Sequence, residues 1–528
     1  MPLSVSAHLD TFTRDNLPPV AQWPEFRFPL PELAYPERLN CAVSLLDDTI
    51  ARHGAGRRCL LTDTTTWTYG ELAERSNQLA HVLVDDLGLV PGNRVLLRAP
   101  NTPWLVACWF AVLRAGCVAV TTVPQMRESE LRTVGEIARV DHSLTDDRYV
   151  DELAAAGIAP LSVESELTER AAGKDTIFPP CDTAADDVAL LAFTSGTTGR
   201  PKATMHFHRD VLANADTFAR HVLRPVPDDL YAGSPPLGFT FGLGGLVVFP
   251  LYAGAATLLV EKPSPDALVA AVTERGATGL FTAPTAYRAM LGALPGVGLP
   301  GLRRCVSAGE PLPRATWQAF HEATGVRLID GIGATEMLHI FVSAADDDIR
   351  AGATGRAVPG YTATVLDADG AEVPDGEIGR LAVRGPTGCR YLADPRQTDY
   401  VQSGWNITGD SYVRDADGYL WYQARSDDMI ISSGYNIAGP EVEQALLEHP
   451  DVMEAGVVGA PDPARTMSVI AYVVLRPGAT VTDDELKSFC KARISPYKCP
   501  RSIAFLDALP RTSTGKLMRH VLRTQSAG

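Results

Sequence analysis

Hydrophobic residues follow two alternating patterns along most of the chain. Apolar residues at helical spacing, as in 68–88 and 104–116, predict helices. Short apolar runs between them, as in 93–101 and 117–124, predict strands. Strands that alternate with helices are typical of βαβ units, so this part of the chain predicts mostly parallel sheet.

The pattern changes towards the C-terminus. From about Gly360 to Tyr422, short alternating runs are separated by Asp-Gly and Pro-Asp-Gly turns, which predicts a small antiparallel β subdomain. Beyond the segment ARSDD (424–428), roughly 100 residues have their own mixture of helical and strand patterns. We therefore predict an α/β fold with a large N-terminal domain over residues 1–425. It consists of βαβ-type sheets layered with helices, plus the antiparallel subdomain. A small α+β C-terminal domain covers 426–528.

Composition narrows the possible partners and compartments. The chain has 528 residues, too many for one compact core, and a formal net charge of −16. That charge disfavours nucleic acids and anionic membranes as partners, because both select for basic surfaces. The most apolar stretch, 104–120, is interrupted by Arg114 and Gly116, so we expect no membrane span. No secretory signal opens the sequence, and nine cysteines lack any CxxC pair, which predicts a cytoplasmic protein with reduced thiols and no structural zinc.

One short segment could hold an anionic group. Residues 194–199 are only Thr, Ser and Gly, and Arg200-Pro201-Lys202 follows. Glycines permit close backbone approach, while hydroxyl and N–H groups can donate to phosphate oxygens. Lys202 adds a positive charge suited to phosphate. By composition alone a plain surface turn remains the commoner explanation, and the pattern differs from a Walker loop.

Six segments in this order resemble the signatures of the adenylate-forming superfamily, which includes acyl-CoA synthetases, peptide-synthetase adenylation domains and luciferases. TSGTTGRPK at 194–202 meets the family's phosphate-loop pattern in full. The later segments are SAGEPL (307–312), DGIGATEM (330–337), NITGD (406–410), ARSDD (424–428) and PRTSTGK (510–516). The resemblance implies an AMP-forming acid–thiol ligase that uses ATP, Mg²⁺ and coenzyme A.

The resemblance also implies roles for individual residues. The implied catalytic residues are Thr335, which can donate to the α-phosphate, Glu336, which can bind Mg²⁺, and Lys516, which stabilises charge as a carboxylate attacks phosphorus. The implied ATP- and AMP-binding residues are Thr194, Ser195, Gly196, Thr197, Thr198, Gly199, Lys202, Ala308, Gly309, Glu310, Pro311, Asp330, Gly331, Ile332, Asp410, Tyr422 and Arg425. Ile332 stands where the family often has an aromatic residue.

The C-terminal domain is implied to be mobile. In this family it rotates between two half-reactions, and the matching hinge position here is Asp427, where lysine is more usual. Ser433, Gly434 and Tyr435 would then approach the pantetheine arm of CoA. Relatives of this family lead us to expect a homodimer.

The acid-binding residues are expected in three segments, 234–245, 281–291 and 330–341. The candidates are Phe239, Thr240, Phe241, Ala283, Tyr287, Gly333 and His339, together with Gly331 and Ile332. The set is apolar and aromatic, with Tyr287 and His339 as polar groups, which suits a benzoate-sized ring. Peptide-synthetase domains for α-amino acids usually have Asp near the position of Phe239, so an α-amino acid is disfavoured.

These segments resemble benzoate-CoA and 2-aminobenzoate-CoA ligases, and salicylate stays open as an alternative acid. Three hypotheses follow: an aryl-CoA ligase, a stand-alone aryl-acid adenylation enzyme that loads a carrier protein, and an adenylate-binding protein without turnover. Lys202, Glu336, Asp410 and Lys516 are all present, which argues against the third. Only about a dozen residues follow Lys516, too few for a fused carrier domain, which favours CoA as the acceptor.

Overall fold

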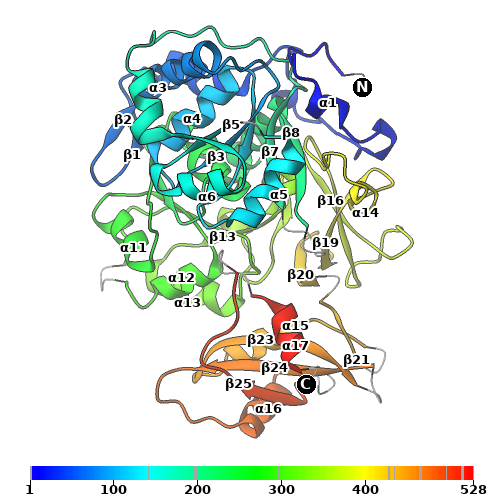
Figure 1. The fold of residues 1–528 in the computed structure, drawn as a ribbon. Coiled ribbons are helices and arrows are strands. Elements are labelled where there is room, and N and C mark those ends of the chain that lie inside the picture. The colour runs from blue at the N-terminus through cyan, green and yellow to red at the C-terminus, as the bar shows by residue number, and fades with distance from the viewer. Residues whose placement is uncertain are drawn as a thin grey trace.

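The computed structural model describes residues 3–140, 142–194, 200–294, 298–425, 428–432, 435–462, 466–494, 496, 498–512 and 517–526. The elements up to β20 form a large body, and the elements from β21 onward gather beside it at one end (Figure 1). This arrangement agrees with the predicted α/β fold class, which is confirmed. The boundary at 425/426 stays a prediction.

The largest sheet lies in the N-terminal part. Its order among the described residues is β15-β14-β13-β12-β11-β9-β10-β1-β2. The bounds are β1 (Arg58–Leu61), β2 (Thr66–Thr68), β9 (Leu230–Gly233), β10 (Ala256–Leu258), β11 (Gly279–Thr282), β12 (Arg304–Ser307), β13 (Leu328–Gly333), β14 (Ile340–Ser343) and β15 (Arg356–Ala357). The strands from β1 through β10, β9, β11 and β12 to β13 are parallel, and β2, β14 and β15 are antiparallel additions at the two edges.

A second sheet in the same part has the order β6-β5-β3-β4-β7-β8. Its strands are β3 (Arg94–Arg98), β4 (Val118–Thr121), β5 (His142–Thr145), β6 (Ala159–Ser162), β7 (Val188–Thr194) and β8 (Lys202–Phe207). All described pairings in it are parallel except the β7–β8 hairpin. The buried helix α4 (Pro103–Arg114) packs against β3 and β4, as the apolar run from 104 predicted.

The other two sheets are smaller. The predicted subdomain consists of antiparallel β16 (Thr362–Leu366), β17 (Ile378–Arg384), β18 (Val401–Gln402), β19 (Trp405–Arg414) and β20 (Leu420–Arg425). The C-terminal sheet contains β21 (Ile430–Ser432), β22 (Tyr435–Ile437), β23 (Val452–Asp462), β24 (Thr466–Leu475) and β25 (Ser502–Phe505). In the latter only the β24–β25 pairing among the described strands is parallel.

The helices begin where local sequence favours them. Thr68 caps α3 (Tyr69–His81) because its side chain accepts from the Glu71 N–H while Glu71 accepts from the Thr68 N–H. The remaining α-helices are α1 (Phe12–Asp15), α2 (Asp48–His53), α5 (Glu128–Ala138), α6 (Val150–Ala155), α7 (Thr168–Ala171), α8 (His208–Asn214), α9 (Thr240–Leu243), α10 (Phe249–Ala253), α11 (Pro265–Thr273), α12 (Pro284–Met290), α13 (Arg314–Thr324), α14 (Gln397–Tyr400), α15 (Gly439–Leu447), α16 (Asp483–Lys491) and α17 (Arg519–Ser526). None within the described part of the chain has the length and hydrophobicity needed to cross a membrane.

Three buried imidazoles make the stability of the N-terminal part sensitive to acid. Burial lowers the pKa of His206, His208 and His339 to about 3 each, whereas an unfolded histidine has a pKa of about 6.5. Below pH 6.5 the unfolded state therefore binds protons that the folded state does not. The free energy of unfolding should fall by about 1.4 kcal/mol per pH unit for each imidazole as the pH drops towards 5.

Urea unfolding at pH 7.5, 6.5 and 5.5 measures this loss. Replacing His208 with asparagine removes one of these imidazoles and should make the slope less steep than in the wild type. An unfolding free energy that stays constant from pH 7.5 to 5 would show that these imidazoles are not held neutral by the fold.

Candidate functional site

The carboxyl ends of the parallel strands define the site. The register aligns Phe281 with Gly233, Thr282 with Ser307, and Ser307 with Asp330. The segments that follow these strand ends are 234–241, 283, 308–311 and 331–332, and all of them contain predicted site residues. Ligands of open α/β sheets bind at this edge, so the fold brings the expected acid and adenine segments together.

The predicted phosphate loop joins the strands of the β7–β8 hairpin. Thr194 and Lys202 face each other at the end of this hairpin, while Ser195, Gly196, Thr197, Thr198 and Gly199 lie outside the described residues. Segment 390–392 runs beside β8, since the Met205 N–H donates to the Arg390 carbonyl and the Leu392 N–H donates to the Ala203 carbonyl. The segment is anchored by a buried ion pair between Arg390 and Asp210.

This arrangement brings Tyr391 between the two charged residues of the predicted Mg·ATP site. The Lys202 ammonium donates to the Tyr391 hydroxyl at 2.6 Å, and that hydroxyl donates to Oε1 of Glu336. Lys202 Nζ lies 3.5 Å from the same carboxylate oxygen and 4.5 Å from the centre of the Tyr391 ring. Burial and the Glu336 charge raise the pKa of Tyr391 far above its usual range, so the hydroxyl keeps its proton.

Thr335 and Glu336 sit on a short helical turn, η9 (Thr335–Met337), which leads into an unusual backbone conformation. The Thr335 carbonyl accepts a hydrogen bond from Nε2 of His206 at 2.8 Å, which fixes the turn to β8. Leu338, directly after the turn, has a φ of +70°. Such backbone strain in a non-glycine residue is typical of functional segments, and here it directs Glu336 and His339 to different neighbours.

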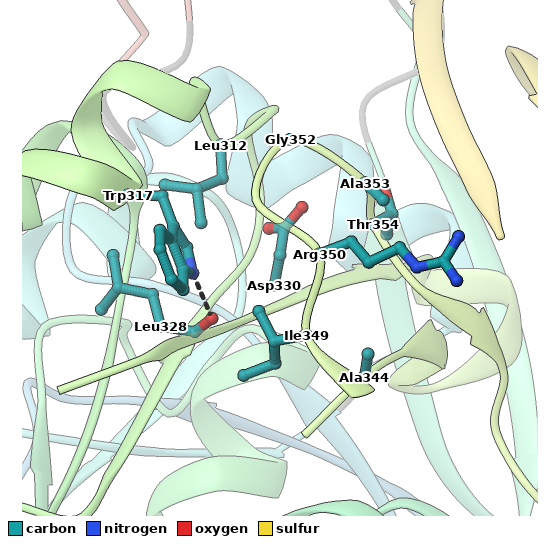
Figure 2. Close-up of a pocket in the computed structure, with 10 residues that line it drawn as sticks. All are labelled: Leu312, Trp317, Leu328, Asp330, Ala344, Ile349, Arg350, Gly352, Ala353 and Thr354. Carbon is teal, nitrogen blue, oxygen red and sulfur yellow. Dashed lines mark hydrogen bonds between the residues drawn. The ribbon is translucent and has the colours of Figure 1, made fainter. Parts of the chain in front are cut away.

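A small pocket contains Asp330, one of the predicted adenine residues. It is lined by Leu312, Trp317, Leu328, Asp330, Ala344, Ile349, Arg350, Gly352, Ala353 and Thr354, with the Asp330 carboxylate in their midst (Figure 2). Trp317 is fixed there because its indole N–H donates to the Leu328 carbonyl at 3.0 Å. Loss of hydration raises the pKa of Asp330 well above its usual range. Gly331 and Ile332 follow on β13, and Ala308, Gly309, Glu310 and Pro311 follow the neighbouring β12.

The predicted ribose residues pair across two strands. Asp410 on β19 and Arg425 on β20 are direct partners in the register, and Arg425 Nη1 lies 3.2 Å from Asp410 Oδ1. Tyr422 lies on the same strand as Arg425, with its ring 5.5 Å from that of Tyr412. The structure therefore brings Asp410 and Arg425 into contact, as their adjacent roles require.

Most of the predicted acid-binding residues surround a cluster of aromatic rings. Phe239 precedes α9, which begins at Thr240 and continues into the helical segment η8 (Gly244–Val248). The ring of Phe241 lies 5.7 Å from that of Phe281 and 5.6 Å from that of His339. Ala283 caps α12 at the adjacent strand end, and Gly333 lies at the surface opposite Ile340.

His339 is the polar member of this cluster. Its side chain is buried, and neither ring nitrogen makes a hydrogen bond of full geometry within the described part of the chain, although the Phe241 backbone lies close enough to interact with the ring. The helix approaches it closely because residue 244 is glycine: a Cβ there would lie 2.3 Å from Cδ2 of His339. A neutral imidazole with unused donor and acceptor capacity can bond a polar substituent on a bound ring.

Tyr287 does not belong with these residues, so its assignment to the acid pocket is corrected. It is fully buried, its hydroxyl donates towards the carbonyls of Leu280 and Val306 at 3.1 Å each, and its ring packs on Phe320. The hydroxyl is already satisfied by backbone carbonyls. Tyr287 therefore stabilises the packing of α12 and α13 and offers no polar group to an acid.

The C-terminal candidates are only partly described. Lys516, Asp427, Ser433 and Gly434 lie outside the described residues, and for Tyr435 only the backbone, in β22, is described. The segment around Lys516 is nevertheless bounded. Arg511 and Leu517 form a β-bridge, and Arg511 Nη1 lies 3.9 Å from Oε1 of Glu310 on the N-terminal side. Arg511 therefore lies near the predicted adenine segment.

Two residues of the site were not predicted from the sequence, Tyr391 and His206. Tyr391 lies 189 positions from Lys202, and no spacing signal connects them. His206 lies on the same strand as Lys202. Its place four residues after Lys202 on a strand, on the same face, was the signal available for it.

The donor set is compatible with a magnesium ion held mainly by a nucleotide. No group of three or more His, Cys, Asp or Glu side chains that could hold a metal was found among the described residues. Glu336 offers one buried carboxylate, with its side chain 8% exposed. Mg²⁺ typically takes one or two carboxylates together with substrate phosphates and water, so Glu336 fits this ion.

Comparison with known proteins identifies the family. The AMP-binding enzyme family matches residues 46–391, and the AMP-binding enzyme C-terminal domain matches residues 441–516. The chain belongs to the AMP-binding enzyme family. A benzoate–CoA ligase of Thauera aromatica is 34% identical over 522 residues, covering 94% of this chain and 97% of that protein.

Two solved structures resemble this AMP-binding enzyme along more than nine-tenths of its length. The anthranilate CoA ligase AuaEII, in complex with anthranoyl-AMP, has a TM-score of 0.89 at 31% identity and covers 94% of this chain and 99% of its own. A benzoate CoA ligase from Burkholderia xenovorans LB400 has a TM-score of 0.85 at 32% identity, covering 92% and 100%. The predicted enzyme class, an AMP-forming acid–thiol ligase, is confirmed by these matches.

Proposed function

We propose that this enzyme is an ATP-dependent aryl-CoA ligase that converts a benzoate-type acid, 2-aminobenzoate or a related ortho-substituted acid such as salicylate, into its CoA thioester. The observation that carries the proposal is the aromatic cluster of Phe241, Phe281 and His339 at the carboxyl edge of the large sheet. Flat apolar side chains around a buried imidazole suit a benzoate-sized ring.

The choice of an ortho-substituted acid rests on His339. Its ring nitrogens make no hydrogen bond of full geometry within the described residues, and burial keeps the imidazole neutral with a pKa of about 3. A neutral imidazole has one donor and one acceptor, so it can bond either an amino or a hydroxyl substituent. Thr240, the residue before Phe241 on α9, is the second polar candidate for the same substituent. The anthranoyl-AMP in the complex of the similar ligase is consistent with this choice.

In the first half-reaction, the acid carboxylate attacks the α-phosphate of ATP and pyrophosphate leaves. Lys202 would contact the outer phosphates, Thr335 would donate to the α-phosphate, and Glu336 would hold Mg²⁺. A bound Mg²⁺ neutralises charge on the phosphates. Asp410, held by Arg425, would accept the ribose hydroxyls, and Asp330 would accept from the adenine amine. Lys516 would stabilise the negative charge that develops at phosphorus.

In the second half-reaction, the CoA thiol attacks the acyl carbon of the adenylate and AMP leaves. Rotation of the C-terminal domain about Asp427 would replace Lys516 with the segment of Ser433, Gly434 and Tyr435 beside the pantetheine arm. The similar proteins described above are CoA ligases, so CoA is the acceptor that they support. Loading of a carrier protein is correspondingly disfavoured.

A pyrophosphate-release screen tests the acid class. Benzoate, 2-aminobenzoate and salicylate are compared with octanoate and phenylalanine at equal concentration with Mg·ATP. The proposal predicts that the aryl acids release pyrophosphate and that the two comparison acids release little, because only a flat ring matches the cluster. Release confined to the fatty acid or the amino acid would overturn the aryl proposal.

A further inference from the structure

We propose that Tyr391 is a positioning residue that keeps Lys202 and Glu336 in the arrangement that Mg·ATP needs. The inference rests on the proposed roles of Lys202 at the phosphates and Glu336 at the metal. Tyr391 itself belongs to none of the segments by which the family was predicted. Its hydroxyl is the one described group that bonds both side chains at once.

The geometry explains why such a residue is needed. Lys202 Nζ and Glu336 Oε1 are 3.5 Å apart, in a place where the two side chains are only 17% and 8% exposed. Opposite charges at this distance and burial attract each other strongly. The Tyr391 hydroxyl occupies part of the bonding capacity of both groups, since it accepts from the ammonium and donates to the carboxylate. A closer ion pair, with a direct hydrogen bond between them, would compete with phosphate for Lys202 and with Mg²⁺ for Glu336.

The hydroxyl is held in place by its backbone. The Tyr391 N–H donates to Oε1 of Gln397 at 2.9 Å, and Tyr391 forms a bridge with Thr204 on β8. The neighbouring Arg390 is fixed in the core by its ion pair with Asp210. The Tyr391 ring therefore cannot shift aside to let Lys202 and Glu336 approach each other. Tyr391 is thus a rigidly held residue whose hydroxyl bonds both charged groups, while its ring lies beneath the Lys202 ammonium.

The chain offers a matched control for this hydroxyl. Tyr400 is packed against Tyr391 with ring centres 6.0 Å apart, and its own hydroxyl is buried without a hydrogen-bond partner in the described part of the chain. Tyr400→Phe and Tyr391→Phe each remove one buried oxygen from the same cluster. Only Tyr391→Phe removes the link between Lys202 and Glu336.

The experiment measures equilibrium binding without any acid, so it does not depend on the identity of the substrate. Calorimetric dissociation constants for ATP with MgCl₂ and for AMP are compared among wild type, Tyr391→Phe and Tyr400→Phe, together with the thermal midpoint of each. We expect Tyr391→Phe to weaken Mg·ATP binding about tenfold, equivalent to about 1.4 kcal/mol. AMP binding should change less than about twofold, because AMP lacks the β- and γ-phosphates that Lys202 and the metal would contact. Tyr400→Phe should match wild type for both nucleotides.

Each outcome decides the role of Tyr391. Equal Mg·ATP affinities for Tyr391→Phe and Tyr400→Phe would overturn the inference. Parallel weakening of Mg·ATP and AMP by Tyr391→Phe would assign the residue a purely structural role and would overturn it as well. If Tyr391→Phe is less stable than the wild type, the ratio of its Mg·ATP affinity to its AMP affinity, measured on the folded protein, still separates a loss specific to Mg·ATP from a parallel loss of both. Failure of the wild type to bind Mg·ATP would instead refute the proposed function, before Tyr391 is tested.

Discussion

Lys516→Ala is expected to slow acyl-adenylate formation by roughly a hundredfold to a thousandfold while leaving CoA attack on a supplied aryl-adenylate near the wild-type rate. The reason is that a preorganised positive charge near the reacting phosphorus lowers the barrier of the first half-reaction only. Arg511 and Leu517 bridge just outside this segment, and Arg511 lies near Glu310 of the predicted adenine segment. Arg511, which precedes this segment, therefore lies on the side of the predicted adenine residues.

Single-turnover measurements of the two half-reactions test this expectation. Lys487→Ala is a matched control in the same part of the chain, because Lys487 lies on α16 and pairs with Asp483 of that helix. It should leave both half-reactions unchanged. An equal loss of both half-reactions in Lys516→Ala would contradict the role assigned to this lysine.

Gly244→Ala is expected to lower kcat/KM for the aryl acid by roughly ten- to a hundredfold, mainly through KM, without weakening Mg·ATP binding. The added Cβ would lie 2.3 Å from Cδ2 and 2.7 Å from Nε2 of His339, so the imidazole must move or the helix must retreat. Extra atoms in a well-packed core typically force side chains off their rotamers and shift the backbone, so the imidazole is expected to leave its position. His339 is enclosed by the rings of Phe218, Phe241 and Phe249, so it has little room to yield.

Steady-state kinetics with the acid as varied substrate, combined with calorimetry of Mg·ATP, test this second expectation. Gly173→Ala is a suitable control, since a Cβ at Gly173 would have nothing within 4 Å. An unchanged KM for the acid in Gly244→Ala would remove the Phe241–His339 cluster from the acid site. A matching loss of Mg·ATP affinity would indicate general misfolding.

The fold could largely be predicted because its signals are local. The apolar run from 104 gave the buried helix α4, and the short run after it gave β4, since helical and strand periodicities are visible within one element. Tyr287 shows the limit of such reasoning. Its segment is helical, but the face that a helix turns to the core depends on the packing of α12 against α13 and the sheet, which a single sequence does not contain.

The site was predictable where a role resides in one contiguous segment, as for Lys202, Glu336 and Asp410. Tyr391 was missed because its role arises from tertiary contacts: segment 390–392 lies beside β8 through backbone hydrogen bonds between residues far apart in the sequence. His206 was missed for a related reason, because its partner is the Thr335 carbonyl and not a side chain of a recognisable motif. A residue that positions another through a tertiary contact has no fixed sequence spacing from it, so a motif search does not find it.

The most direct test of the central claim is mass spectrometry of the products formed from 2-aminobenzoate, benzoate or salicylate with Mg·ATP and CoA. The account predicts that an aryl-CoA thioester accumulates, with one AMP and one pyrophosphate released for each thioester. Accumulation of the aryl-adenylate without any thioester in the presence of CoA would contradict it.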